Sequence, residues 1–92
     1  MRIILNFRGQ LANALGGSSE KIDIDGGSSI NSILQDLAVR GGTAFTDIAF
    51  DSHGTPSRTL LVAVDGEQVT DFEMGLAPHT KEITFIPPIA GG

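Results

Sequence analysis

The sequence predicts a single α+β domain in which one amphipathic helix packs on a mixed β-sheet. Three observations lead to this fold class. A chain of 92 residues has room for one domain, several short segments alternate apolar and polar residues, and one longer segment repeats its apolar residues with helical spacing. The content of 40% hydrophobic and 18% charged residues is typical of an ordinary globular domain and argues against disorder.

Two strands are expected at the start of the chain. Residues 1–7 alternate in polarity, and residues 20–25 alternate again, with Ile22 and Ile24 on one face. The Gly-Gly-Ser-Ser break between the two segments predicts a long, loose connection. The two strands are therefore interpreted as an antiparallel pair.

One helix of about three turns is expected over residues 30–39. Ser28 or Ser29 can cap its first turn, and Arg40 suits the negative end of the helix dipole. Gly41 is expected to provide the left-handed exit. The helix carries one apolar stripe at i, i+3, i+4, i+7 and i+8, formed by Ile30, Ile33, Leu34, Leu37 and Ala38.

The second half of the chain is expected to complete the sheet. Residues 44–50 fit either a short helix or a strand, and residues 51–58 form a loop by their Ser, Gly and Pro content. Residues 59–64 predict a strand that is apolar on both faces, followed by an Asp-Gly hairpin turn at residues 65–66. Residues 82–86 predict the last strand, because two prolines follow it and cannot donate to a ladder.

This order of elements is the ββαββ arrangement of a β-grasp, ubiquitin-like domain. The domain is expected to span residues 1–86, with residues 87–92 as a flexible, extended C-terminal tail. The first and last strands should be neighbours at the centre of the sheet, so that the tail leaves from its middle.

Composition excludes several classes of function. The chain has no cysteine, which removes disulfides and thiolate metal sites and is compatible with the cytoplasm. A net charge of −5 disfavours nucleic acid as a partner, and no apolar run is long enough to span a membrane. His53 and His79 have no partners at metal-ligand or acid–base spacing, so we expect no metal site and no catalytic group of the chain's own.

The C-terminal segment is the strongest candidate for the reactive group. Its prolines favour an extended backbone, and its glycines can enter a slot too narrow for a side chain. A terminal carboxylate on Gly92 is ionised near neutral pH, so another protein has to activate it, for instance by adenylation with ATP. The segment consists of Pro87, Pro88, Ile89, Ala90, Gly91 and Gly92.

The stretch "ITFIPPIAGG" resembles the C-terminus of the MoaD/ThiS family of ubiquitin-like sulfur carriers, in particular the molybdopterin synthase small subunits. A weaker resemblance covers the whole chain, through "MRIILNF", "SINSILQDLAV" and "LLVAVDGEQV". The resemblance implies that an E1-like enzyme adenylates Gly92 with ATP and that a persulfide donor converts it to a thiocarboxylate. The tail, including Gly91, then delivers the sulfur inside a partner enzyme, and the carrier itself binds no cofactor.

Several pathways could receive the sulfur. The Pro-Pro pair favours the small subunit of molybdopterin synthase, whose large subunit would accept the sulfur in molybdenum cofactor biosynthesis. The long segment over residues 44–58 is more like related carriers that serve cysteine synthesis, and thiamine-type biosynthesis is a further route. A ubiquitin-like modifier that forms isopeptide bonds through Gly92, and a binding module with an inert tail, are the alternatives from other classes.

A docking surface is expected on the sheet face that the helix does not cover. Ile4, Leu61 and Ala63 belong to strands with apolar residues on both faces, so they are candidates for an exposed partner-binding patch. Phe7 resembles an aromatic residue that contacts the activating enzyme in the family. The alternative for Phe7 is a place in the core, where aromatic side chains commonly lie.

Overall fold

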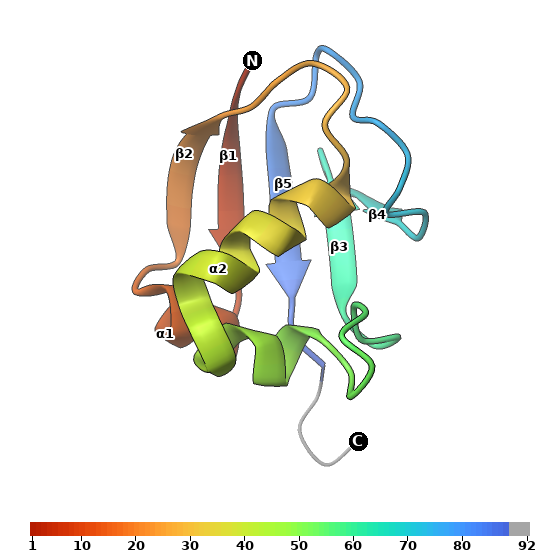
Figure 1. Cartoon of the computed structure of the whole chain (residues 1–92). Coiled ribbons are helices and arrows are strands. Elements are labelled where there is room, and N and C mark those ends of the chain that lie inside the picture. Colours follow the sequence, from red (N-terminus) through yellow and green to blue (C-terminus); the bar gives the residue numbers. More distant parts are fainter. Residues whose placement is uncertain (89–92) are drawn as a thin grey trace.

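The computed structural model describes residues 1–88 of the chain, and residues 89–92 lie outside the described part. The described chain forms five strands and two helices around one core (Figure 1). Their bounds are β1 Arg2–Phe7, α1 Gln10–Leu15, β2 Ser19–Asp23, α2 Ile30–Ala49, β3 Leu61–Val64, β4 Glu67–Val69 and β5 Glu82–Ile86.

The five strands form one mixed sheet in the order β2-β1-β5-β3-β4. β1 and β5 pair in parallel at its centre, whereas the β1–β2, β3–β5 and β3–β4 pairs are antiparallel. α2 lies across one face of this sheet (Figure 1). The β-grasp prediction is therefore confirmed, including the central position of the first and last strands.

The core lies between the sheet and α2, as the alternating pattern of the strands requires. Leu5 of β1, Val62 of β3 and Phe85 of β5 are almost completely buried on this face. From α2 the apolar stripe contributes Ile30, Ile33, Leu34 and Leu37, which are all buried. Burial of such side chains stabilises the fold by roughly 1.5–3 kcal/mol each.

α2 begins at a capping box. Ser29 is the N-cap, since its hydroxyl accepts a hydrogen bond from the backbone N–H of Ser32 at 3.1 Å. The hydroxyl of Ser32 accepts in return from the backbone N–H of Ser29 at 3.1 Å. Two of the helix's otherwise unpaired donors are thereby satisfied, and Ser29 is the cap of the two serines that the sequence offered.

α2 continues beyond the predicted end at Val39. The positive φ falls at Gly42 (φ 60°, ψ −148°) and not at Gly41. It interrupts the helical backbone, so α2 consists of two helical segments joined at a kink. Helical structure then resumes to Ala49, so the helix is the correct alternative for residues 44–50. The reason is burial, because Phe45 and Ala49 extend the apolar stripe into the core.

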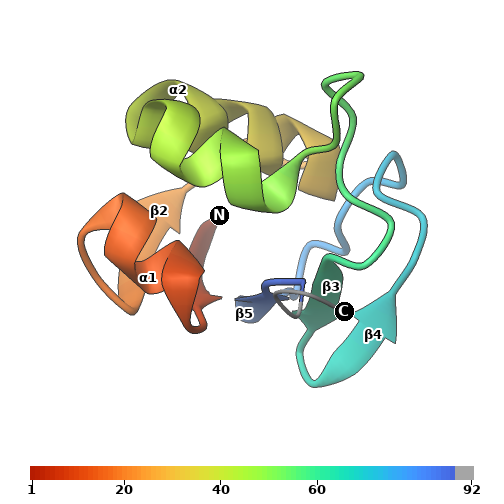
Figure 2. The ribbon, with the colours of Figure 1, turned by 90° about the horizontal axis from the view of Figure 1, so that it is seen from below.

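α1 was not predicted, and the connection between β1 and β2 is not a loose loop. The six residues of α1 bury Leu11 and pack against α2, as Figure 2 shows. The contact is close at Gly41, where a Cβ atom would lie 3.1 Å from Cδ2 of Leu15 and 2.5 Å from Cβ of Phe45. α1 ends at Gly16, which has the left-handed backbone of a C-cap (φ 78°).

An ion pair between Glu20 and Arg40 joins β2 to α2 and gives the fold a testable pH dependence. The hydrogen bonds from Arg40 lower the pKa of the Glu20 carboxyl below its usual value. The associated stability is complete above the unfolded-state pKa of about 4.3 and is lost as the pH falls through the lower folded-state pKa. We expect Glu20→Gln to be less stable than the parent at neutral pH and equally stable near about pH 2.

Urea denaturation followed by circular dichroism across this pH range measures the difference. Asp23→Asn is the matched control, because Asp23 pairs with Arg2 at 3.1 Å while both side chains are largely exposed to solvent. Exposed pairs contribute little, so the control should change stability less than Glu20→Gln at neutral pH. A Glu20→Gln variant with an unchanged pH profile would contradict the prediction.

Candidate functional site

The base of the C-terminal tail lies at the end of the central strand. β5 is flanked by β1 and β3, and the ladder continues to its last residues, where Ile86 pairs with Leu61. On the other side the backbone N–H of Arg8 donates to the carbonyl of Phe85 at 3.1 Å. Pro87 and Pro88 follow and have no N–H, so the ladder stops there as predicted.

Pro87 is packed against the connection between β1 and α1. It is half-buried, and a Cβ atom on Gly9 would meet its Cγ at 3.5 Å. Gly9 has a positive φ (52°) that glycine adopts most readily, so this residue shapes the surface on which the tail base rests. Sequence reasoning did not select Gly9; the available signal was a glycine immediately after the first strand.

Ile89, Ala90, Gly91 and Gly92 lie outside the described residues, and their roles remain predictions. The described residues show where the tail starts and that it starts from the middle of the sheet.

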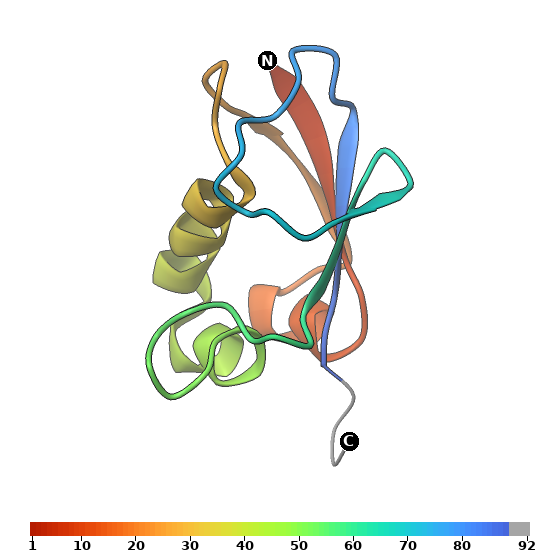
Figure 3. The ribbon, with the colours of Figure 1, turned by 90° about the vertical axis from the view of Figure 1, so that its right-hand side faces the viewer.

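The open face of the sheet carries an apolar patch. Figure 3 shows α2 on one side of the sheet and no helix on the other. Ile4, Leu61 and Ile86 are 37%, 42% and 37% exposed there, and Ala63 is half-buried beside them. The predicted residues Ile4, Leu61 and Ala63 thus share one face, and Ile86 joins them because it alternates with the buried Phe85. We call Ile4, Leu61, Ala63 and Ile86 the open-face patch.

Phe7 does not belong to this patch, which corrects its assignment as a partner-binding residue. It is 3% exposed and its ring stacks on Phe85 with centroids 5.9 Å apart. The cause is the period of β1, since Phe7 points to the same side as Ile3 and Leu5, toward α2. The core alternative for Phe7 is the correct one.

Polar groups border the open-face patch. Asn6 donates to the Glu82 carboxylate at 3.1 Å, and Arg2 pairs with Asp23 across the β1–β2 ladder. The hydrogen bond from Arg2 lowers the pKa of Asp23 and keeps this carboxyl ionised over a wider pH range. The register pairs Ile4 with Glu82 and Ala63 with Thr84, so polar side chains of β5 lie between Ile4 and the neighbouring residues Leu61, Ala63 and Ile86.

Among residues 1–88, no cluster of three His, Asp or Glu side chains can hold a metal ion, and no helix is long and apolar enough to cross a membrane. Ser28 bonds to the carbonyl of Asp25, and Asp71 accepts from the backbone N–H of Glu73. Both hydrogen bonds stabilise loops.

Comparison with known proteins identifies a family. The sequence profile of the ThiS family matches residues 5–92, which includes both the folded part and the tail. No curated protein sequence matches the chain.

Solved structures with the same fold cover essentially the whole chain. SAMP1 from Haloferax volcanii has a TM-score of 0.80 at 22% identity and covers 100% of both chains. A putative molybdopterin converting factor subunit 1 from Pyrococcus furiosus has a TM-score of 0.72 at 15% identity, over 97% of this chain and 99% of that one. A chain in the complex of subunits 1 and 2 of the Helicobacter pylori molybdopterin-converting factor has a TM-score of 0.57 at 16% identity, with 100% coverage of both. At these identities the likeness shows the fold.

Truncation of a side chain to alanine should affect stability differently on the two faces of β1. Phe7→Ala removes a buried aromatic ring and should lower the free energy of unfolding by about 3–5 kcal/mol. Ile4→Ala on the open-face patch should cost less than about 1 kcal/mol, because that side chain is already partly solvated. Chemical denaturation of both variants measures the difference, and similar losses would show that Phe7 is not a core residue.

Proposed function

The chain belongs to the ThiS family of ubiquitin-like sulfur carriers, and from this membership we propose that it carries sulfur as a thiocarboxylate on Gly92. The observation that carries the proposal is the extent of the family match, which runs through the tail to residue 92. The proposal takes Gly92 as the terminal residue of the mature protein. An E1-like enzyme would adenylate its carboxylate with ATP and release pyrophosphate. A persulfide would then displace AMP to form an acyl disulfide, and a thiol would cleave the S–S bond, which leaves the thiocarboxylate on Gly92 and a disulfide on the donor.

The described geometry supports this role. A carrier has to present its end to two different enzymes, and a tail that starts from the central strand is held at its base by both neighbouring strands. Pro87 and Pro88 restrict the backbone where the tail begins. Beyond them, Ala90 and the two glycines are small enough to thread into a narrow active site, as the proposal requires.

We propose the large subunit of molybdopterin synthase as the sulfur acceptor. The Pro-Pro pair and the likeness to the Pyrococcus furiosus converting factor subunit support this choice, and the Helicobacter pylori relative is found in a complex of subunits 1 and 2. The reaction would take place in the cytoplasm. One alternative is a carrier for cysteine or thiamine-type biosynthesis. Another is a protein modifier, and the likeness to the small archaeal modifier protein SAMP1 supports this second alternative.

Intact-mass analysis of the protein from its native host tests the proposal. We expect a species heavier by the difference between sulfur and oxygen, located on Gly92 by fragmentation. Deletion of Gly92 should abolish this species without changing the circular dichroism spectrum, because the folded core ends at β5.

The other outcomes separate the alternatives. Conjugates to lysines of other proteins would identify a modifier, and a permanently unmodified terminus would identify an inert module. Transfer of sulfur from the loaded protein to the molybdopterin precursor by the purified large subunit would support the proposed destination, and failure there would redirect it to another acceptor.

The open-face patch is proposed as the surface that the activating enzyme contacts. Leu61→Asp places a charge at the most exposed position of the patch, where a docked partner would have to desolvate it. We expect thiocarboxylate formation to slow by about tenfold or more, since burial of one leucine is worth that factor.

Gln35→Asp is the matched control. It adds the same charge at an exposed position of α2, on the other side of the sheet. Its loading rate should equal that of the parent protein. Equal rates for Leu61→Asp and Gln35→Asp would exclude the patch from the activation step.

A further inference from the structure

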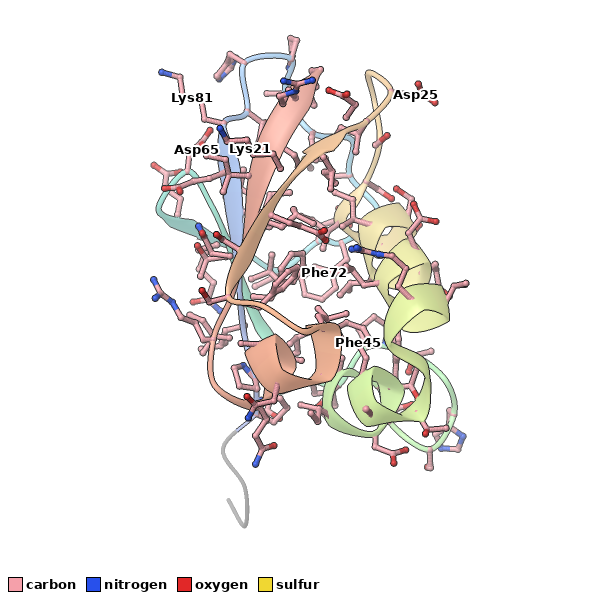
Figure 4. The ribbon with its side chains drawn as sticks, turned by 90° about the vertical axis from the view of Figure 1, so that its left-hand side faces the viewer. Lys21, Asp25, Phe45, Asp65, Phe72 and Lys81 are labelled. Carbon is pink, nitrogen blue, oxygen red and sulfur yellow. The ribbon has the colours of Figure 1, made fainter. Side chains whose placement is uncertain are left out.

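A second surface lies at the outer edge of β2, where Lys21 is the cross-strand neighbour of Ile4 of the open-face patch. β2 is an edge strand, because within the described residues its only partner is β1. Beside it, a hollow of about 430 Å³ opens between β2 and α2. Figure 4 looks onto this edge, with β2 and α2 side by side and Asp25 beyond the end of the strand.

The backbone of β2 has groups that point out of the sheet. Ile24 and Met1 exchange both backbone hydrogen bonds, at 2.8 and 2.7 Å, and form a hydrogen-bonded pair of the antiparallel ladder. Such pairs alternate with non-bonded pairs along an antiparallel ladder. By this alternation, the backbone groups of Ile22 and Glu20 bond to β1. The backbone N–H and C=O groups of Lys21 and Asp23 therefore face away from β1.

The hollow beside these groups is lined by apolar side chains. Ile22 and Ile24 contribute from the β2 side, and Ile33, Leu37 and Val39 contribute from α2. Val39 is 85% exposed, the most exposed of the large apolar side chains among the described residues. A β-branched residue this exposed on a helix, next to an apolar hollow, has no role in the core.

The hollow is lined by two carboxylates, Asp23 and Asp36, and by the guanidinium of Arg40, and Lys21 lies on the adjacent strand. Arg40 is engaged by Glu20, and Arg2 by Asp23, so each arginine near this edge is neutralised by a carboxylate. Asp36 also lines the hollow and makes no ion pair with the described residues. A ligand that carries a positive charge at this point would gain an ion pair with Asp36.

We propose that this edge binds an extended segment of a partner protein, which adds to β2 as a sixth strand. Its backbone pairs with the outward groups of Lys21 and Asp23, and its alternate side chains are apolar and fill the hollow between Ile22 and Val39. A flanking lysine or arginine of the segment faces Asp36. Backbone pairing supplies affinity in this mode of recognition, and the hollow supplies specificity.

The β2 edge suits this role better than the edge at the other side of the sheet. β4 has only three residues, Glu67–Val69, and therefore presents a shorter ladder. β2 has five residues. Hollows lie beside both edges, of about 430 Å³ at β2 and 510 Å³ at β4, so the longer ladder decides in favour of β2. The inference does not rest on the sulfur chemistry, since neither Val39 nor Lys21 belongs to the tail or to the open-face patch.

Titration of the ¹⁵N-labelled full chain with a blocked peptide, Lys-Val-Thr-Val-Thr-Val-Lys, tests the proposal by NMR. We expect the amide shifts to concentrate in residues 20–24 and 36–40. Lys21→Pro removes an outward N–H without breaking the β1–β2 ladder, and Lys21→Thr is its control for loss of the charge. The proline variant should bind about fivefold to tenfold more weakly than the threonine variant, which is the worth of one net backbone hydrogen bond.

Three further measurements keep the test decisive if Lys21→Pro fails to fold. Val39→Thr keeps the shape of the side chain and should weaken binding about threefold. Leu61→Lys, on the open-face patch, should bind the peptide like the parent. A peptide with glutamate in place of both lysines should bind more weakly because it meets Asp36.

Four results would overturn the proposal: no amide shifts, shifts concentrated on β3 and β5, equal affinity of the two Lys21 variants, or equal affinity of the lysine and glutamate peptides. Shifts that follow protein concentration in the absence of peptide would assign the edge to a second copy of the chain and would also overturn it.

Discussion

The parallel pairing of β1 with β5 is the constraint on which the rest of the structure depends. It joins the two ends of the described chain at the centre of the sheet, in the register that opposes Leu5 to Ile83 and Phe7 to Phe85. All four of these side chains are buried under α2, and the two aromatic rings stack. Because β5 is enclosed on both sides, the tail leaves from the best-supported strand of the fold, and any force on the tail acts against two ladders.

The second constraint is that the described chain has one long helix for a two-faced sheet. α2 and the short α1 cover one face, so Ile4, Leu61 and Ile86 stay partly exposed on the other. For an isolated globule this exposure would bring no benefit, whereas a carrier that visits several enzymes needs such a surface. The outer edge of β2 is also unpaired within the described residues, since β1 is its only partner strand. The molecule therefore divides into a closed core, an open face near the tail base and an open edge beside α2.

The likeness to known structures extends over the whole chain at identities of 22% or lower. A fold can persist at such identity because it depends on which positions are apolar and on their period, and many residues satisfy both. The chemistry proposed for the tail depends in contrast on particular residues, the glycines above all. The fold is thus specified by a pattern distributed over residues 1–86, whereas the proposed function depends on the last few residues.

The sequence by itself determined the strand segments, the first half of α2 with its serine cap, the fold class and the tail as candidate site, because period and local chemistry specify these features. Only the tertiary structure decided that α1 forms, that α2 bends at Gly42 and continues to Ala49, and that Phe7 is buried. Alternation shows which residues of a strand share a face, but packing elsewhere in the chain decides which face is covered. A six-residue helix is too short to be stable alone, and it forms here because Leu11 is buried and α1 packs against α2.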